Sequence, residues 1–154
     1  MTKPLIVYYS RFKSTEKLAL EIAVLTDGVL MELIPENDYS FNYNTAVKEV
    51  RSQIERGFCP PLKPINESIE GYQTIFIGSP NWLKKLAPPV KTFLKQYDFS
   101  GKTIIPFCTH GGGGFGDIEK DIAEICQLSE IKSGFASTSM VETELLENWL
   151  SSLE

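Results

Sequence analysis

A strand pattern that runs directly into four consecutive glycines constrains this chain more than any other feature. Residues 102–109 predict a strand, and Gly111 to Gly114 follow before a helical pattern begins at about Asp117. Glycine permits positive φ and close backbone approach. In an open α/β sheet, ligands bind just outside the carboxyl ends of the strands. The run therefore predicts a ligand-facing loop, although a plain mobile connection has the same composition.

Glycines at positions 111, 113 and 116 also match the dinucleotide fingerprint. The match is weak, because that fingerprint belongs to the first βα turn of a Rossmann unit, with an acid about 20 residues on. Here the next predicted strand ends near residues 135–138, which contain no acid. We therefore set the Rossmann hypothesis aside and look for other loops that share a site with the glycines.

Strand and helix patterns alternate along the rest of the chain. Apolar, β-branched runs predict strands at 4–10, 29–34, 73–79, 102–109 and, more weakly, 132–137. Helical periodicity predicts helices from a Ser14 cap to residue 27, at 45–56, at 88–97 and at 117–126. A capping box at 139–142 predicts a last helix with the buried stripe Leu145, Trp149 and Leu153. Pro106 conflicts with the fourth strand, because proline cannot donate to a sheet ladder.

This rhythm predicts one α/β domain over residues 1–154, which is an ordinary length for a single domain. Five strands alternating with helices indicate a doubly wound, five-stranded parallel sheet with helices on both faces, in the strand order 2-1-3-4-5. The switch point of that order lies between strands one and three. Loops 10–15, 80–86 and 109–116 should therefore converge on one crevice.

Charge and composition exclude several classes of partner. The net charge of −5 and pI of about 5.0 argue against nucleic acid or an anionic membrane as a partner, and no apolar run has the length of a membrane span. The charge is also mild for a dedicated low-potential electron carrier. Three cysteines without a CxxC and a single histidine predict no metal site. With no visible signal peptide, we expect a cytoplasmic protein.

The three loops together have the chemistry of a flavin mononucleotide (FMN) site. The first joins a strand to a helix N-terminus, where free N–H groups and the helix dipole favour a phosphate. Ser10, Ser14 and Thr15 can donate to it, although such residues also occur there simply as caps. Trp82 offers an apolar face to a planar ring, unless it belongs to the core. The glycine loop allows the backbone to approach the ring's other edge.

At these loops the sequence resembles the flavodoxin-like family, especially its small NAD(P)H-dependent FMN oxidoreductase branch. The resemblance covers nearly the whole chain, in the motifs VYYSR (7–11), TEKLA (15–19), APPVKTFL (87–94), YDFSGK (97–102) and IPFCTHGGGGFG (105–116). It implies that Ser10, Ser14 and Thr15 bind the FMN phosphate. It implies further that the ring is bound by Pro80, Trp82, Thr109, His110, Gly111, Gly112 and Gly113.

The chain departs from the family at two turns. The family has Thr-Gly where this sequence has Phe12-Lys13, and Trp-Gly where it has Leu83-Lys84. Lysine at a positive φ costs on the order of 1 kcal/mol relative to glycine. We therefore expect a weakened FMN site.

The resemblance implies an oxidoreductase that passes electrons from NAD(P)H to a quinone-like or other small acceptor. No catalytic side chain is required, because FMN carries the chemistry. The alternatives are a flavodoxin-type electron carrier and a flavodoxin-fold protein that has lost FMN. His110 is either a proton relay or a residue that holds its loop. Lys84 and Lys85 either attract a pyridine-nucleotide phosphate or form a solvated rim, and a homodimer is left open.

Overall fold

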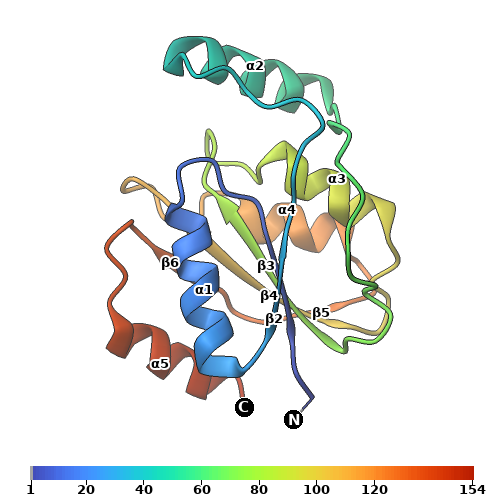
Figure 1. The fold of residues 1–154 in the computed structure, drawn as a ribbon, viewed down its shortest axis with the longest axis vertical. Coiled ribbons are helices and arrows are strands. Elements are labelled where there is room, and N and C mark those ends of the chain that lie inside the picture. The colour runs from blue at the N-terminus through green and yellow to red at the C-terminus, as the bar shows by residue number, and fades with distance from the viewer. Residues whose placement is uncertain (1) are drawn as a thin grey trace.

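A parallel sheet forms the middle layer of the computed structural model, which describes residues 2–154 (Figure 1). The strand order is β2-β1-β3-β4-β5, with β6 also pairing with β4, so the predicted α/β class and strand order are confirmed. The elements are β1 (Leu5–Tyr8), α1 (Ser14–Thr26), β2 (Val29–Glu32), α2 (Tyr43–Arg56), β3 (Thr74–Pro80), α3 (Pro88–Gln96), β4 (Thr103–Thr109), α4 (Ile118–Ile125), β5 (Glu130–Ile131), β6 (Phe135–Ser137) and α5 (Thr143–Ser152).

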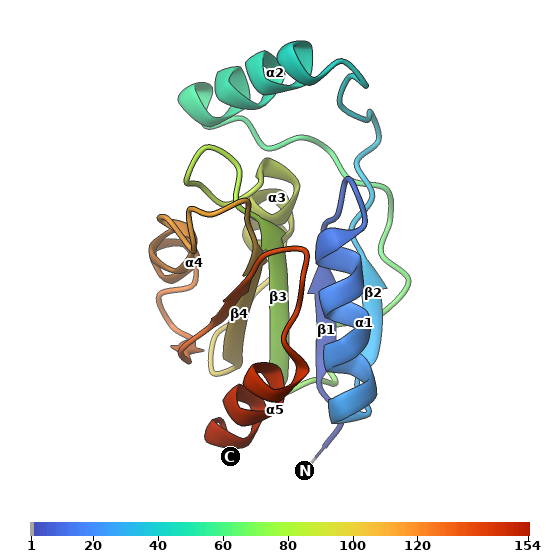
Figure 2. The same ribbon diagram turned by 90° about the vertical axis from the view of Figure 1, so that its left-hand side faces the viewer.

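The two faces of the sheet are covered by different helices (Figure 2). Successive side chains of a strand point to opposite faces. Leu5 and Val7 accordingly pack in the core under α3 and α4, whereas Ile6 and Tyr8 pack under α1 and α5. Both faces of the central strands are buried, which explains why their sequences are continuous apolar runs.

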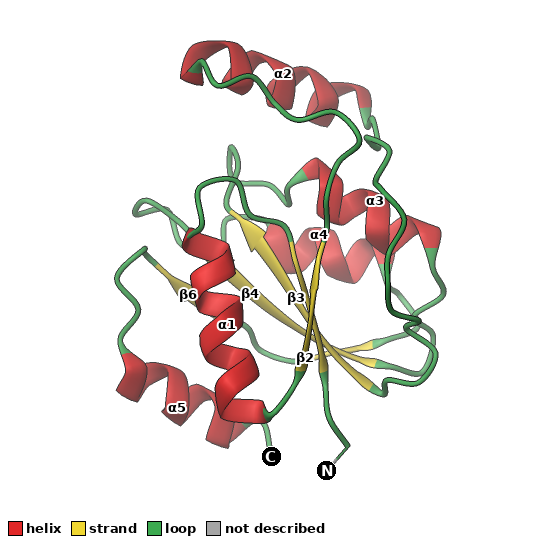
Figure 3. Ribbon diagram, viewed as in Figure 1, coloured by secondary structure: helices red, strands yellow, loops and turns green. Residues whose placement is uncertain are grey.

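Helix α2 belongs to a long insert between β2 and β3 and stands at the carboxyl end of the sheet (Figure 3). It begins at Tyr43, two residues earlier than predicted, because the Asn42 side chain accepts a hydrogen bond from the Thr45 N–H (3.0 Å). Its buried residues are Ala46 and Val50. The insert is therefore an ordered part of the fold, placed next to the loops that were predicted to converge.

The predicted fifth strand is two short strands, β5 and β6, separated by residues 132–134. The Lys132 N–H donates to Ile104 O (2.9 Å), so the polar backbone groups of Ile104 face this side of β4. Along a strand, the backbone N–H and C=O groups of successive residues point to opposite sides. Pro106, two residues after Ile104, therefore directs its backbone polar groups toward residues 132–134, between β5 and β6. Because residues 132–134 are not part of a strand, no sheet hydrogen bond is lost there when proline lacks an N–H. This removes the conflict over Pro106.

Two predicted helix caps are wrong. Ser14 is the first residue of α1 rather than its cap, and the cap position is held by Lys13 in the left-handed conformation. The capping box at 139–142 does not form, because α5 begins at Thr143 after Glu142, which makes no side-chain cap bond. In the buried stripe of α5 the prediction is wrong for Leu145, which is exposed while Leu146 is fully buried. Trp149 and Leu153 are partly buried and pack against the core, as predicted.

Among the described residues, no helix is long and apolar enough to cross a membrane.

Candidate functional site

A hollow of about 580 Å³ lies at the carboxyl ends of β1, β3, β4 and β6. All of the predicted site residues line it except Gly112 and Gly113, which lie in the same glycine loop: Ser10, Ser14, Thr15, Pro80, Trp82, Thr109, His110 and Gly111. Its other lining residues are Arg11, Phe12, Asn81, Thr138, Ser139 and Met140. We call this space the cofactor hollow. The three predicted loops do converge, as the strand order requires.

The β1–α1 turn presents polar groups that lack partners within the protein. The Ser10 hydroxyl is buried and makes no hydrogen bond. Lys13 has φ 70 and ψ −9, and α1 begins directly after it. The first N–H groups of a helix have no partner inside the helix, and its dipole makes this end positive. A buried hydroxyl without a partner beside a helix N-terminus suits an anionic group.

Thr15 and Thr109 join the first turn to the end of β4. Their hydroxyls lie 2.7 Å apart and both side chains are buried. One hydroxyl donates to the other, and the accepting hydroxyl keeps its own hydrogen for a further acceptor. The predicted donor Thr15 is therefore partly committed to holding the site together.

The β3–α3 loop contains a tight turn with two non-glycine residues at positive φ. Leu83 has φ 56 and Lys84 has φ 67. Trp82 and Lys85 flank them, with the Lys85 N–H donating to Trp82 O (2.9 Å) and the Trp82 N–H donating to Lys85 O (3.2 Å). Two consecutive positive φ values are the mark of a type I′ turn, in which Asn-Gly is usual. The sequence thus keeps the turn that the family builds with glycine, at a steric cost.

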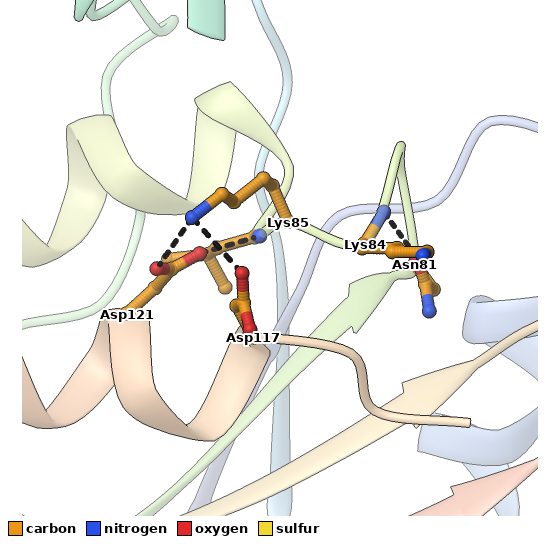
Figure 4. Close-up of polar contacts among 6 residues, drawn as sticks. Asn81, Lys84, Lys85, Asp117 and Asp121 are labelled. Atoms are coloured by element: carbon orange, nitrogen blue, oxygen red, sulfur yellow. Dashed lines mark hydrogen bonds and ion pairs between the residues drawn. The ribbon is translucent and has the colours of Figure 1, made fainter. Parts of the chain in front are cut away.

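This loop is held against the glycine loop by the side chain of Asn81 and by backbone groups. The Asn81 side-chain amide donates to Gly114 O (2.7 Å), and the Asp117 N–H donates to Lys84 O (2.7 Å). The Lys84 N–H in turn donates to Asn81 Oδ1 (2.9 Å) (Figure 4). A Cβ on Gly116 would lie 2.7 Å from Lys84 O, so only glycine permits this approach.

Two carboxylates at the start of α4 complete the connection (Figure 4). Lys85 Nζ lies 3.1 Å from Asp117 Oδ2 and 3.7 Å from Asp121 Oδ1, and the Leu86 N–H donates to Asp121 Oδ2 (3.0 Å). The hydrogen bond to Asp117, with the attraction of Asp121, raises the pKa of Lys85. Lys85 is therefore an ion-pair partner, although its side chain remains partly exposed. Lys84 makes no ion pair among the described residues.

Trp82 is held edge-on by two tyrosines instead of projecting freely. Its ring centroid lies 5.3 Å from that of Tyr9 and 5.0 Å from that of Tyr39, both in T-shaped geometry. The Tyr39 hydroxyl donates to Gln53 Oε1 on α2 (2.6 Å). Burial raises the pKa of both tyrosines, so each hydroxyl stays protonated. The insert that carries α2 thus sets the orientation of the ring that faces the hollow.

His110 holds the glycine loop from within. Its Nδ1 accepts a hydrogen bond from the Gly112 N–H (3.0 Å), and its own backbone N–H donates to Ser137 O (3.0 Å). These contacts favour the loop-holding role over that of a proton relay. Below the loop, burial raises the pKa of the Cys108 thiol to about 12, which makes it an unreactive core residue.

A fourth loop, between β6 and α5, also lines the hollow at Thr138, Ser139 and Met140 and was not predicted from the sequence. A signal was available. In the predicted strand order, the strand next to the glycine-loop strand ends at about 137, so its loop must flank the same crevice. In residues 2–154, no group of three or more His, Cys, Asp or Glu side chains is arranged to hold a metal ion.

The sequence profile of the Flavodoxin family matches residues 3–153. A flavoprotein of Lactobacillus acidophilus NCFM, solved in complex with FMN, is 26% identical, with a TM-score of 0.80 over 97% of this chain and 99% of that chain. A candidate flavoprotein of Bacteroides uniformis ATCC 8492 is 25% identical, with a TM-score of 0.87 over 97% of each chain. One from Bacteroides eggerthii DSM 20697, at 23% identity and a TM-score of 0.87 over 97% of this chain and 96% of that one, supports the fold alone. No curated protein sequence matches this chain.

Proposed function

The chain belongs to the flavodoxin family, and on that premise we propose that it binds FMN and passes electrons from NAD(P)H to a quinone-like or other small acceptor. The proposal includes a cytoplasmic location, with which the three free cysteines Cys59, Cys108 and Cys126 agree. The single observation that carries the proposal is the buried Ser10 hydroxyl without a partner at the N-terminus of α1.

The residues present fit FMN. Ser10, Ser14 and the accepting hydroxyl of the Thr15–Thr109 pair would donate to the phosphate, together with the first N–H groups of α1. Lys13 adds a positive charge to the same turn. The absence of an internal partner for Ser10 is explained if a phosphate oxygen accepts its hydrogen, because a buried hydroxyl left unpaired is destabilising.

The ring of FMN would be bound between the β3–α3 loop and the glycine loop. Pro80 and Trp82 would contact it on one side, and the backbone of residues 109–113 on the other. Trp82 needs no reorientation by the ligand, since Tyr9 and Tyr39 already hold its ring. When bound, FMN accepts either a hydride or single electrons. The side chains of the hollow bind and orient it, and none is required as a nucleophile or a general base.

The mouth of the hollow supports a small reaction partner. Phe12 and Met140 are 70% and 80% exposed there and offer apolar contacts to a planar acceptor. The net charge of −5 is too mild to attract a strongly basic redox protein by electrostatic steering. Both features favour small molecules as electron donor and acceptor.

A fluorescence titration tests the cofactor, and rapid mixing tests the donor. We expect the protein to quench FMN fluorescence with one FMN per chain. The FMN-loaded protein should then be bleached by NADH or NADPH and regain its colour on addition of a benzoquinone. Absence of quenching at high micromolar protein would contradict the proposal. To test ring binding, Trp82→Ala should weaken the binding of FMN. The expected loss is about 0.5–1.5 kcal/mol in addition to that from the apolar area no longer buried.

An electron carrier is the second candidate, and the exposed Phe12 and Met140 also favour it, since apolar side chains around a mouth can contact a protein. It predicts that neither pyridine nucleotide bleaches the loaded protein, whereas a ferredoxin-type reductase does. The same rapid-mixing experiment therefore separates the two functions.

A further inference from the structure

A second hollow, of about 250 Å³, adjoins the cofactor hollow. The two share the turn residues Ser10, Arg11 and Phe12, so only this turn separates them. We propose that this adjacent hollow binds the adenosine half of NADH and makes the protein select NADH over NADPH. The inference rests on the function proposed above, because it gives the electron donor a second point of attachment.

The position of the adjacent hollow suits a dinucleotide. Hydride transfer requires the nicotinamide to lie against the FMN ring, and the adenosine must then lie within the length of a pyrophosphate bridge. The shared turn stands between the two hollows and carries the positive side chain of Arg11, which lines both. A pyrophosphate crossing the turn would meet positive charge, which favours this path.

Two aromatic side chains at the adjacent hollow are free to stack on a purine base. Phe12 is 70% exposed and Phe41 is fully exposed, and both line the hollow. The Arg11 guanidinium lies 4.7 Å from the centroid of the Phe12 ring, which adds a second planar group. Stacking of a base on aromatic and guanidinium planes is a recurring means of binding a nucleobase.

Two carboxylates in the same hollow suit the ribose. Glu32 is the last residue of β2, paired with Tyr8 of β1, and it follows the turn at Ser10 by about 20 residues. In Rossmann folds an acid at the equivalent strand end accepts hydrogen bonds from the ribose 2′-hydroxyl. Asp38 lines the hollow as well. Neither carboxylate is in an ion pair within residues 2–154.

The electrostatics of Glu32 agree with this assignment. Burial, and then the neighbouring Glu16, raise its pKa. Two ribose hydroxyls would supply donors, whereas the 2′-phosphate of NADPH would place like charge against both Glu32 and Asp38. The hollow should therefore accept the diol and repel the phosphate.

Adenosine itself is the first probe, because it carries no phosphate that could occupy the β1–α1 turn. Adenosine added to the FMN-loaded protein, and to the protein without FMN, should shift the amide NMR resonances of Glu32, Asp38 and Phe41. We expect 2′-deoxyadenosine to bind roughly tenfold more weakly, because it lacks one donor to a charged acceptor. Resonance shifts confined to the cofactor hollow, or equal binding of the two nucleosides, would overturn the inference.

The second measurement uses variants with matched controls. The double variant Glu32→Gln, Asp38→Asn should bind NADH roughly tenfold more weakly and should bind NADPH no more weakly. Both affinities are measured from the concentration dependence of flavin bleaching. Glu36→Gln, in the same segment but outside the hollow, should change neither. Likewise Phe41→Ala should weaken adenosine binding, whereas Tyr43→Ala, exposed but outside the hollow, should not.

The outcomes separate this inference from the proposed function. If adenosine binds in the adjacent hollow but neither nucleotide bleaches the flavin, the hollow stands as an adenosine site and the proposed donor is wrong. If NADPH bleaches the flavin as well as NADH does, and the double variant changes nothing, the proposed function stands and the adjacent hollow is not the adenosine site.

Discussion

The β1–α1 turn and the β3–α3 loop flank the same hollow, and both hold residues other than glycine in a left-handed conformation. Lys13 has φ 70 in the first, while Leu83 and Lys84 have φ 56 and φ 67 in the second. Such residues cost free energy locally and persist only when the surroundings determine their conformation. The two regions meet that requirement in different ways.

The β3–α3 loop is supported by the protein itself. Both backbone polar groups of Lys84 are hydrogen-bonded, and Lys85 and Leu86 are tied to α4 through Asp117 and Asp121. The β1–α1 turn has less support. Lys13 caps α1 without a side-chain bond, the Ser10 hydroxyl has no partner, and the turn's side-chain tie to the insert is the hydrogen bond from Arg11 to Ser40 O. Under the proposed function, the β3–α3 loop would be formed before the ring binds, whereas the β1–α1 turn would be completed by the phosphate.

The largest expected effect comes from breaking the support of the β3–α3 loop. Gly116→Ala should lower the free energy of unfolding by roughly 3 kcal/mol, because it combines a side chain at φ 54 with a Cβ 2.7 Å from Lys84 O. Gly114→Ala is the control: φ is 66, but no atom lies within 4 Å of the added Cβ, and about 1 kcal/mol is expected. Urea denaturation measures both. Equal losses would mean that the close approach to Lys84 does not matter.

Asp121 should come next. Asp121→Ala removes the acceptor of the buried Leu86 N–H together with one partner of Lys85, and we expect a loss of about 2 kcal/mol. Asp121→Asn keeps an oxygen for Leu86 and should cost less than half of that. If the two variants are equally destabilised, the ion pair and not the hydrogen bond supports the loop.

For the β1–α1 turn, we predict effects of opposite sign on stability and on binding. Ser10→Ala should stabilise the protein without FMN by about 1 kcal/mol, because it removes a buried hydroxyl that has no partner. The same change should weaken the binding of FMN by about fivefold, because one hydrogen-bond donor to the phosphate is lost. Thermal unfolding and FMN titration measure the two quantities. Ser139→Ala, exposed on the far wall, serves as the control. A fall in the stability of the FMN-free protein would show that Ser10 already has a partner.

Lys13 tests the strain in the same turn. Lys13→Gly should stabilise the protein without FMN by about 1 kcal/mol, since glycine adopts a positive φ without a steric penalty. FMN affinity should change by less than about fivefold, because the lost positive charge opposes the relief of strain. Lys17→Gly, inside α1, should instead destabilise by about 1 kcal/mol. If both lysine variants lose stability, the turn at Lys13 is not strained.

The smallest effect expected is the alkaline contribution of Lys85. Its pKa is raised by the hydrogen bond to Asp117 and by Asp121, so its stabilisation is complete below the usual pKa of lysine and is lost as pH rises through the raised value. The side chain is 41% exposed, and the contribution should therefore stay below about 1 kcal/mol. Lys85→Met should abolish this part of the alkaline loss in melting temperature. An unchanged slope would place the loss in other groups, such as Tyr8, whose pKa is raised to about 12.

The amino-acid sequence predicted the architecture and most of the cofactor hollow. Apolar runs and helical periodicity are local patterns, and the order of parallel strands brings their carboxyl ends together whatever the loops contain. Ser10, Trp82 and Thr109 could therefore be assigned to one site although they are far apart in the chain. The predictions that were wrong concerned the first turns of helices, as with Ser14 and Leu145. There a shift of one residue changes the role of a side chain.

What only the tertiary structure decided is how each loop is supported. The pairs that support them are distant in sequence: Thr15 with Thr109, Asn81 with Gly114, and Leu86 with Asp121. A hydrogen bond depends on the distance and direction between two atoms, and these follow from how layers pack, which no local pattern of residues contains. The sequence thus determined that the loops meet, and the packing determined that one is complete by itself while the other has a buried hydroxyl left to pair.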